Sequence, residues 1–498
     1  MSTLSSALLL APLKPRDRHF ATRFSYGHST ALEKQVRDAG GGRAWFEKQL
    51  NPSKIKDAGG DKVKDWYPNL WYSPNKLFYR NYHSDVIGED AASWNVMANM
   101  GRWTMMRRVH TSRQLHELMT EFWSNLLHVP LGDDQAWPYR MSYDAMIRKH
   151  ALGRFDEMLQ AATTHPSMGL YLDNATSTKD APNENLGREL LELHSVGVDA
   201  GYTEDDVQAS AKMLTGYRVD LYVETVDGSG DYDGVRSLYD TTWHHTGKLT
   251  IMDFSAANKK ADGRDATAKY ISYLAHHPKT AKRIARRLCV RFVHDAPSAN
   301  LVNTVAKAWT RSGTDIKATL RALVAHPEFA SSEGAKVRMP LEETIATIRA
   351  LGIKPRKPVN EGAFANDIYW VAQGQGMTPY SWPTPDGFPE EDVPWSSPGR
   401  ALDSLNVQRE LSQQWWPTED AQFPSDKSWC PDLPAKFGDV VDFMGKRMLG
   451  KAPTPRLRDA MAQRVGIPLT QRVTWDDLQD EVKFMLMILL GSPAHMTR

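Results

Sequence analysis

The sequence has little cysteine, no long apolar run and almost no net charge. Its two cysteines, Cys289 and Cys430, lie far apart and form no spacing typical of a metal site. No apolar run is long enough to span a bilayer, so we expect no membrane-spanning segment. The formal net charge is +1, whereas nucleic-acid-binding surfaces usually carry a basic excess. The sequence therefore predicts neither a membrane-spanning protein nor a nucleic-acid partner.

Signals for export and for nucleotide binding are also missing. The first residues are apolar only briefly and lack a basic stretch before them, so no signal peptide is expected and the chain as written is predicted to be cytoplasmic. No nucleophile elbow, Walker loop or dinucleotide fingerprint occurs. The sequence assigns no residue to a metal, and it leaves the cofactor unknown.

What is present is typical of a large globular protein. The 498 residues are 41% hydrophobic and 24% charged, which allows two or three domains or one helical body with insertions. The 16 tryptophans are many for this length. They indicate either a large aromatic core or a cleft that contacts carbohydrate.

Apolar residues at three- and four-residue steps predict a mainly α-helical protein with a multi-helix, orthogonal or bundle-like body. The pair His165-Pro166 is predicted to end one of these helices. A small β-hairpin insertion is expected near 218–250, where Asp227, Asp231 and Asp233 favour a turn over a calcium loop. The predicted helices lie within 15–50, 89–128, 143–164, 266–275, 279–293, 299–312, 316–325, 341–351, 399–416, 435–449, 455–464 and 475–490.

This pattern predicts three stretches of different composition. We expect a main helical domain over 1–350, which includes the hairpin insertion. A connecting loop rich in proline and glycine is predicted over 351–400, and a loop of that length is usually functional or covers something. Helices over 401–498 are predicted to pack on the main body.

The most polar helix in the chain is predicted to begin near Pro182 and to end near Gly197. Arg188 is placed to bridge two carboxylates one turn away on either side, Glu184 and Glu192. A second helix follows, and Thr203 with Asp206 has the spacing of a capping box.

A straight helix separates the candidate side chains of this segment. At 100° per residue Glu189 and Glu192 share one face, whereas His194 lies on the opposite side with the leucines. One straight helix therefore cannot hold a metal with these three residues, and another segment must complete any site. We expect that segment to be the His244–Lys248 loop, with the 383–395 loop as a lid. The catalytic candidates are Glu189, Glu192, His194 and His244, and the substrate-binding candidates are Asn183, Asn185, Arg188, Lys248, Asp386 and Trp395.

Several motifs together resemble a bacterial family known as domain of unknown function 1800 (DUF1800). The strongest is Asn183-Glu-Asn-Leu-Gly-Arg-Glu-Leu-Leu-Glu-Leu-His-Ser-Val-Gly-Val, and Pro383-x-Pro385-Asp386-Gly387-Phe388-Pro389 is another. The resemblance implies a mainly helical fold, frequent export, and a partner from a sulfatase-like family that is often encoded alongside. It implies no established activity. Two positions differ from the family pattern: Leu126-Leu127-His128 follows Asn125 where the family has His-Phe, and His244-His245 replaces a His-Asp pair.

Three hypotheses for function remain open at this point. The first is a hydrolase-like enzyme in which Glu189 or Glu192 exchanges protons with the help of His194 or His244 and acts on an unknown small-molecule or polymeric substrate. The second is a non-catalytic scaffold or partner protein in which the polar helix forms a buried hydrogen-bond network. The third is a metal- or haem-binding protein, although no local spacing of ligands supports it.

Overall fold

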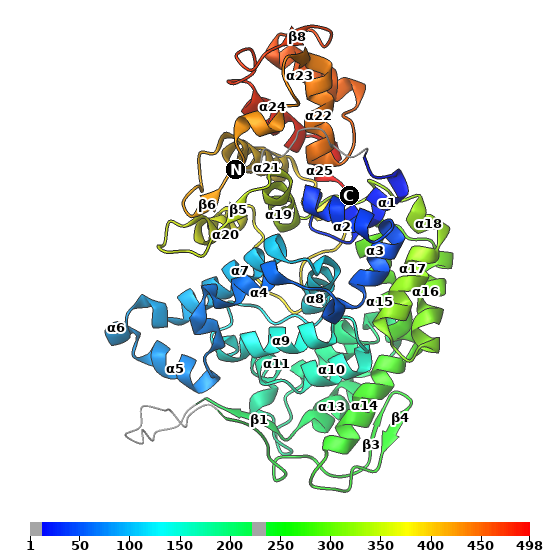
Figure 1. Ribbon diagram of the computed structural model, residues 1–498. Coiled ribbons are helices and arrows are strands. Elements are labelled where there is room, and N and C mark those ends of the chain that lie inside the picture. The colour runs from blue at the N-terminus through cyan, green and yellow to red at the C-terminus, as the bar shows by residue number, and fades with distance from the viewer. Residues whose placement is uncertain (1–11, 222–235) are drawn as a thin grey trace.

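The computed structural model describes residues 12–221 and 236–498, and the predicted turn at Asp227, Asp231 and Asp233 lies outside them. Helices dominate the described residues, which confirms the predicted fold class (Figure 1). The first half contains α1 (Pro15–Arg23), α2 (Thr30–Asp38), α3 (Gly42–Gln49), α4 (Ala58–Val63), α5 (Pro74–Tyr82), α6 (Ser84–Ile87), α7 (Ser93–His110), α8 (Gln114–Leu126), α9 (Arg140–His150), α10 (Phe155–Thr163), α11 (Pro166–Tyr171), α12 (Asn185–Glu189) and α13 (Glu204–Leu214).

The second half is also built mainly from helices. In Figure 1 the C-terminal helices, orange to red, form the upper end of the molecule, and α15 to α17 run along one side. The helices are α14 (Arg264–His276), α15 (Pro278–Phe292), α16 (Ala299–Arg311), α17 (Ile316–Ala325), α18 (Pro327–Ala330), α19 (Pro340–Leu351), α20 (Phe364–Gly374), α21 (Pro398–Gln413), α22 (Phe437–Leu449), α23 (Pro455–Val465), α24 (Val482–Leu490) and α25 (Pro493–Met496).

Short helical turns connect many of these helices. A single π-helical segment among the described residues, η7 (Leu190–His194), continues α12. The 3₁₀ turns are η1 (Pro52–Lys54), η2 (Lys64–Trp66), η3 (Pro68–Trp71), η4 (Glu89–Ala91), η5 (Trp137–Tyr139), η6 (Asn174–Thr176), η8 (Val198–Ala200), η9 (Val393–Trp395) and η10 (Asp426–Trp429).

The strands of the described residues form only two-stranded antiparallel sheets. Two of these sheets lie in the predicted insertion: β1 (Tyr217–Asp220) pairs with β2 (Arg236–Tyr239), and β3 (Leu249–Ile251) pairs with β4 (Phe254–Ala256). The small hairpins of the fold prediction are therefore confirmed. Two further pairs join distant segments: β5 (Lys354–Pro355) with β6 (Ala421–Gln422), and β7 (Ala435–Lys436) with β8 (Arg472–Val473).

Three His-Pro pairs begin helices in this structure. In each pair proline takes the first helical position, where its missing N–H costs nothing, and the preceding histidine caps the helix. The prediction that a helix ends at His165-Pro166 is confirmed by the end of α10, but the same pair also begins α11. The caps are His165 Nδ1 accepting from Ser167 N–H, His277 Nδ1 accepting from Lys279 N–H, and His326 Nδ1 accepting from Glu328 N–H.

Two segments differ from the sequence prediction. The single helix expected over 143–164 is two helices, because the backbone of 153–155 leaves the helical path to bond with 314–316. The stretch expected to be a loop over 351–400 contains α20. The dense prolines and glycines on either side of α20 hide the apolar spacing of Phe364, Ile368 and Val371.

The buried apolar side chains form two clusters. The first includes Phe24 and Phe122, and it draws on elements from α1 to α18. The second includes Trp103 and Phe437, and it combines α4, α5 and α7 with the helices from α19 onward. Helix α8 serves both clusters, since Leu118 packs in the second. The division into 1–350, 351–400 and 401–498 stays a prediction.

A buried network of charges joins helices of the two clusters. Arg291 of α15 lies 2.7 Å from Glu342 of α19 and 3.3 Å from Glu121 of α8. It also lies 3.4 Å from Glu390 in the loop before α21. Burial opposes ionisation of Glu342, but the charge of Arg291 and its neighbours outweighs it and lowers the pKa of that carboxyl to about 2. The network is completed by Arg108 and Tyr26 on Glu121 and by Arg498 on Glu342.

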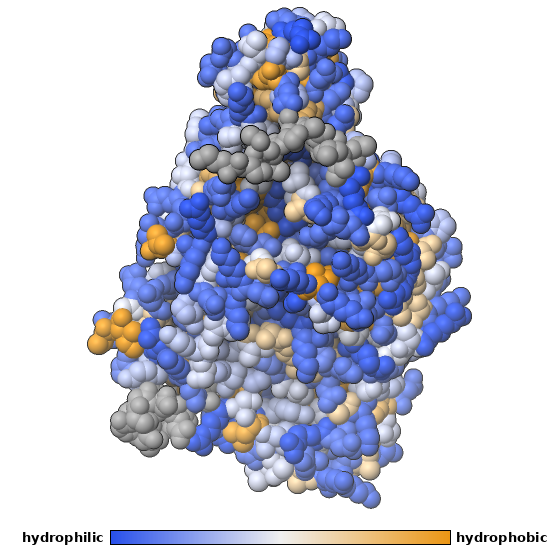
Figure 2. All heavy atoms as spheres, in the orientation of Figure 1, coloured by the Kyte–Doolittle hydropathy of each residue, from blue (hydrophilic) through white to orange (hydrophobic). Residues whose placement is uncertain are grey.

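The outer surface is mainly polar on the face shown in Figure 2, where hydrophobic residues appear as scattered spots. One exposed apolar residue is Val86 in α6, with 82% of its surface accessible. Within residues 12–221 and 236–498, no helix has both the length and the apolar character needed to cross a bilayer.

Replacing Arg291 by methionine should destabilise the protein strongly, because three buried carboxylates would lose their common partner. We expect Arg291→Met to lower the free energy of unfolding by about 3–5 kcal/mol. Urea unfolding measures this change. Arg286→Met on the exposed face of the same helix should change the free energy by no more than about 0.5 kcal/mol. A loss below about 1 kcal/mol for Arg291→Met would contradict the role of the network.

Candidate functional site

The predicted polar helix is not straight. It starts as α12, where Asn183 Oδ1 accepts a hydrogen bond from Asn185 N–H at 2.9 Å, and widens into η7 at Leu190. Pro182 precedes the helix and does not lie in its first turn. Ser195 donates its hydroxyl to the Leu190 carbonyl, which satisfies an acceptor that an α-helix would bond to a backbone N–H. The angles of a straight helix therefore hold only up to Leu190. π-Helical turns of this kind often occur at functional sites.

Close packing fixes the position of α12. Ser210 of α13 donates its hydroxyl to the Gly187 carbonyl at 3.1 Å. A Cβ atom at Gly187 would lie 2.8 Å from the backbone nitrogen of Ala211, so only glycine allows this approach. The capping box predicted at Thr203 and Asp206 is confirmed at the start of α13. Both helices are thus held in one arrangement.

Glu189 is a half-buried carboxyl group without a hydrogen bond or ion pair in the described part of the chain. Burial raises the pKa of Glu189, and the negative charges of Glu192 and Asp386 raise it further, while Arg188 lowers it. A carboxyl group in such surroundings keeps its proton at a higher pH than usual, which suits a general acid.

Asp386 lies in the loop between α20 and α21, and its negative charge raises the pKa of Glu189. Partial burial opposes its ionisation, but hydrogen bonds from Thr384 Oγ1 at 2.5 Å and Trp382 Nε1 at 2.9 Å outweigh burial and lower the pKa of Asp386. His128 adds to this lowering through its charge. Two neighbouring carboxyl groups therefore have pKa values displaced in opposite directions.

Tyr171, at the end of α11, lies beside this pair and was not among the sequence candidates. Its hydroxyl donates to the Pro383 carbonyl at 3.3 Å. Burial raises the pKa of Tyr171 to about 12, and the charges of Asp133, Glu189 and Asp386 contribute to the increase. Tyr171 thus contacts the loop that carries Asp386, and its pKa responds to the charges of both carboxyl groups.

Asn125, which precedes the stretch that differs from the family pattern, and His128, which ends it, hold the Asp386 loop. Asn125 donates to the Phe388 carbonyl at 2.7 Å and accepts from the Phe388 N–H at 2.6 Å. His128 donates from Nε2 to the Trp382 carbonyl at 2.7 Å. Gly387 has φ of 72°, and a Cβ atom there would lie 2.2 Å from the Asn125 carbonyl oxygen, so the loop requires glycine.

His194 is buried on the far side of η7. Burial lowers the pKa of His194 to about 3, with Arg283 contributing, so the imidazole is uncharged at neutral pH. Neither ring nitrogen has a hydrogen-bond partner within the described residues. The charge of His128 also lowers the pKa of His194. Its predicted catalytic role stays a prediction.

The carboxylates around Arg188 form a surface ion cluster. Arg188 lies 3.2 Å from Glu184 and 3.8 Å from Glu192, as the helical spacing predicts, and 2.6 Å from Glu204 of α13. Burial raises the pKa of Tyr202, and the neighbouring Glu192 raises it further. These contacts engage Arg188 and Glu192, in contrast to Glu189 one turn away. The roles proposed for both residues remain predictions.

His244 is a buried side chain held by two acceptors. Its Nδ1 lies 2.9 Å from the Thr215 carbonyl oxygen, and its Nε2 lies 3.0 Å from Asn258 Oδ1. The ring packs so closely on Gly263 that a Cβ atom there would lie 1.9 Å from Nε2. His244 is thus hydrogen-bonded on both ring nitrogens, whereas Glu189 has no hydrogen bond among the described residues. Lys248, in the same loop, is exposed.

The remaining substrate-binding candidates, Asn183, Asn185 and Trp395, contact residues in neighbouring loops. Asn185 donates to Asp173 at 2.7 Å, and the Asn183 backbone N–H donates to Ser177. Trp395 packs against Phe388, and its indole N–H donates to the Pro389 carbonyl at 3.0 Å. Of all the candidates, Glu189 is the one whose pKa is raised by the charges of two others, Glu192 and Asp386.

A comparison with protein families now identifies the chain. The family model described as "Protein of unknown function (DUF1800)" matches residues 19–497, which is almost the whole length. The chain belongs to the DUF1800 family. No curated protein and no solved structure matches it. The family places no activity on the site, so the chemistry must be argued from the residues.

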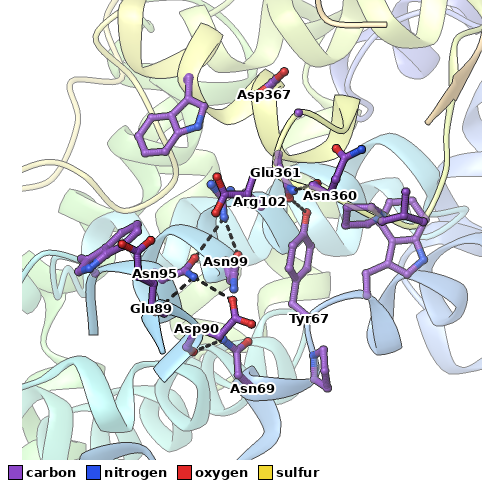
Figure 3. Close-up of a pocket in the computed structure, with 18 of the residues that line it drawn as sticks. Tyr67, Asn69, Glu89, Asp90, Asn95, Asn99, Arg102, Asn360, Glu361 and Asp367 are labelled. Atoms are coloured by element: carbon purple, nitrogen blue, oxygen red, sulfur yellow. Dashed lines mark hydrogen bonds between the residues drawn. The ribbon is translucent and has the colours of Figure 1, made fainter. Parts of the chain in front are cut away.

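The described residues contain no group of three or more His, Cys, Asp or Glu side chains arranged to hold a metal ion. They do contain a cavity of about 780 Å³ between α7 and α20, which Figure 3 shows. None of the predicted site residues lines it. The Glu189–Asp386 pair and the α7–α20 cavity are therefore separate places in this DUF1800 protein, and a further cavity of about 700 Å³ is lined by Glu192.

Replacing Glu189 by glutamine should stabilise this protein at pH 7. The folded chain binds the Glu189 proton more tightly than the unfolded chain, whose carboxyl has the ordinary pKa of 4.5, so ionisation above pH 4.5 costs stability. We expect Glu189→Gln to raise the free energy of unfolding at pH 7 by about 0.5 kcal/mol or less, because solvent screens the charge of a half-exposed carboxyl group. The gain should shrink towards zero at pH 4.

Glu192→Gln is the matched control, because it removes a carboxylate that Arg188 and Tyr202 contact. It should give no gain at either pH. Chemical denaturation at both pH values measures the two variants. An equal effect of the two substitutions would contradict the distinct environment of Glu189.

Proposed function

We propose that this DUF1800 protein is an acid/base hydrolase whose reacting groups are Glu189 and Asp386. The observation that supports the proposal is that Glu189 lacks any hydrogen bond or ion pair among the described residues, while its charge and that of Asp386 both act on Tyr171, which contacts the Asp386 loop. A carboxyl group that only stabilised the fold would have partners, as Glu342 and Glu121 do.

The roles follow from the environment of each group. Pairs of titratable groups whose surroundings push their pKa values apart are typical of acid/base assignments. Glu189, with its raised pKa, would donate a proton to the leaving group. Asp386, with its lowered pKa, would accept a proton from the attacking water. The water oxygen bonds to the substrate as the scissile bond breaks, and the leaving group departs with the proton from Glu189. After product release Asp386 gives its proton to solvent and Glu189 takes one up, which restores the starting state.

The neighbouring residues position the pair. Asn125 and His128 fix the loop of Asp386, and Gly187 fixes the helix of Glu189. Tyr171 contacts Pro383 in the loop that carries Asp386, and its hydroxyl group would also contact the substrate. Hydrolysis of glycosidic bonds uses two carboxyl groups in these roles, which makes glycosides one class to test.

The scaffold hypothesis receives less support at this helix. A buried network does exist, but it is centred on Arg291 and does not include Glu189. The polar face of α12 is instead a half-exposed cluster around Arg188.

A panel of 4-nitrophenyl glycosides and 4-nitrophenyl esters tests the hydrolase proposal. Glu189→Gln and Asp386→Asn should each lower kcat by about 10²–10⁴-fold on any compound that the wild type hydrolyses. The wild-type rate should follow a bell-shaped pH profile, because one group must be protonated and the other ionised.

Glu204→Gln serves as the control, because Glu204 is an exposed carboxylate in the Arg188 cluster outside the pair. It should keep the wild-type rate. Hydrolysis that survives both pair substitutions within tenfold, or a wild type that hydrolyses no member of the panel, would contradict the proposal.

A further inference from the structure

The α7–α20 cavity has the size and openness of a ligand site. Its volume of about 780 Å³ lies within the range of roughly 300–1,000 Å³ that small-molecule sites occupy. Helix α7 and the turns η3 and η4 form one side, and α20 with the 358–362 segment forms the other (Figure 3). Gly101 allows the two helices to approach, since a Cβ atom there would lie 2.3 Å from the Tyr369 ring.

Amide and guanidinium groups are fixed at the floor of the cavity. Arg102 is only 9% exposed, and its Nη1 donates to Asn99 Oδ1 at 2.7 Å and to Asn95 Oδ1 at 3.3 Å. In Figure 3 Arg102 lies at the centre with both asparagines beside it. Its Nη2 has no hydrogen-bond partner in the described residues, and its Nε is buried without one. A buried, partly unpartnered guanidinium is costly, and a ligand acceptor at this floor would relieve that cost.

Aromatic faces line the rim of the cavity. Trp94 is 51% exposed and Trp370 is 41% exposed, although tryptophan is usually well buried. Tyr67 is buried behind them and donates its hydroxyl to Asn366 at 3.0 Å. Exposed tryptophan faces beside fixed amides suit a ligand that has both apolar ring faces and hydroxyl edges.

The charge of the cavity selects against anions. Four carboxyl groups and two guanidinium groups line it, which gives a formal charge of −2. A phosphate, sulfate or uronate would meet this negative field and be repelled. The carboxyl groups are Glu89, Asp90, Glu361 and Asp367, and the guanidinium groups are Arg80 and Arg102.

An organic cation fits less well, because the protein's own cations already contact the aromatic rings. The Arg102 guanidinium lies 5.5 Å from the Trp370 ring centre. Lys76 lies 3.9 Å and Arg80 lies 5.5 Å from the Tyr72 ring centre. A cationic ligand would be repelled by these groups at the Trp370 and Tyr72 rings.

We propose that the α7–α20 cavity binds a neutral oligosaccharide, with Trp94 stacking on a sugar ring and Arg102, Asn95 and Asn99 bonding its hydroxyl groups. The cavity shares no lining residue with the Glu189–Asp386 pair. Binding here is thus independent of the proposed hydrolysis, and a direct binding measurement can fail or succeed whatever the enzyme assay shows.

Isothermal titration calorimetry with the full chain tests the proposal. The probes are four neutral hexasaccharides (cellohexaose, maltohexaose, xylohexaose and chitohexaose), the acidic hexagalacturonate, and choline. We expect at least one neutral hexasaccharide to bind with a Kd of about 1 mM or tighter. Hexagalacturonate and choline should bind at least tenfold more weakly than that hexasaccharide.

Variants assign any binding to the cavity. Trp94→Ala should weaken the binding at least tenfold, and Trp370→Ala provides a second exposed position where truncation leaves the core intact. Trp415→Ala is the matched control, because Trp415 is 62% exposed and lies outside the cavity. The proposal is overturned if no neutral hexasaccharide binds, if binding is unchanged in both Trp94→Ala and Trp370→Ala, or if hexagalacturonate or choline binds best.

Discussion

The buried contacts of Arg291 are the constraint on which the rest of the structure depends. One guanidinium joins carboxylates from α8, α19 and the loop before α21, and so ties the two hydrophobic clusters together. Buried charges stabilise a fold only when their pairing is nearly complete, and this requirement leaves few alternative arrangements. Glu390 carries the constraint onward, because Asn125 donates to it at 3.1 Å and also holds Phe388. The position of the loop that carries Asp386 thus depends on a charge network in the core.

Much of the fold follows from local sequence pattern. Helices such as α15 and α16 bury one regular face, so their apolar spacing alone predicts them. The break between α9 and α10 escapes prediction because it depends on pairing with residues some 160 positions later, at 314–316. The two-residue pairs β5–β6 and β7–β8 escape for the same reason. Non-local hydrogen bonds leave no periodic signal in the segments that they join.

The candidate site is predictable in part. Glu189 and Asp386 are recognisable from the sequence, one beside leucines in a helix rich in ionisable side chains and the other between prolines. The electrostatic interaction between them is not recognisable from the sequence. It depends on the core network and on the two hydrogen bonds between Asn125 and Phe388. Tyr171 gives no signal, since a tyrosine at a helix end is most often a packing residue. The π-helical turn at Leu190 gives none either, although Glu192 still reaches Arg188 and His194 is still buried, as the straight-helix angles predicted.

A double-mutant cycle on Glu189 and Asp386 tests most directly whether the two carboxyl groups face each other. The free energy of unfolding would be measured at pH 7 for the wild type, Glu189→Gln, Asp386→Asn and the double variant. Because the charge of Asp386 adds to the cost of ionising Glu189, the account predicts a smaller stability gain from Glu189→Gln when Asp386 is already asparagine. An equal gain in both backgrounds, or a loss of stability from Glu189→Gln, would contradict it.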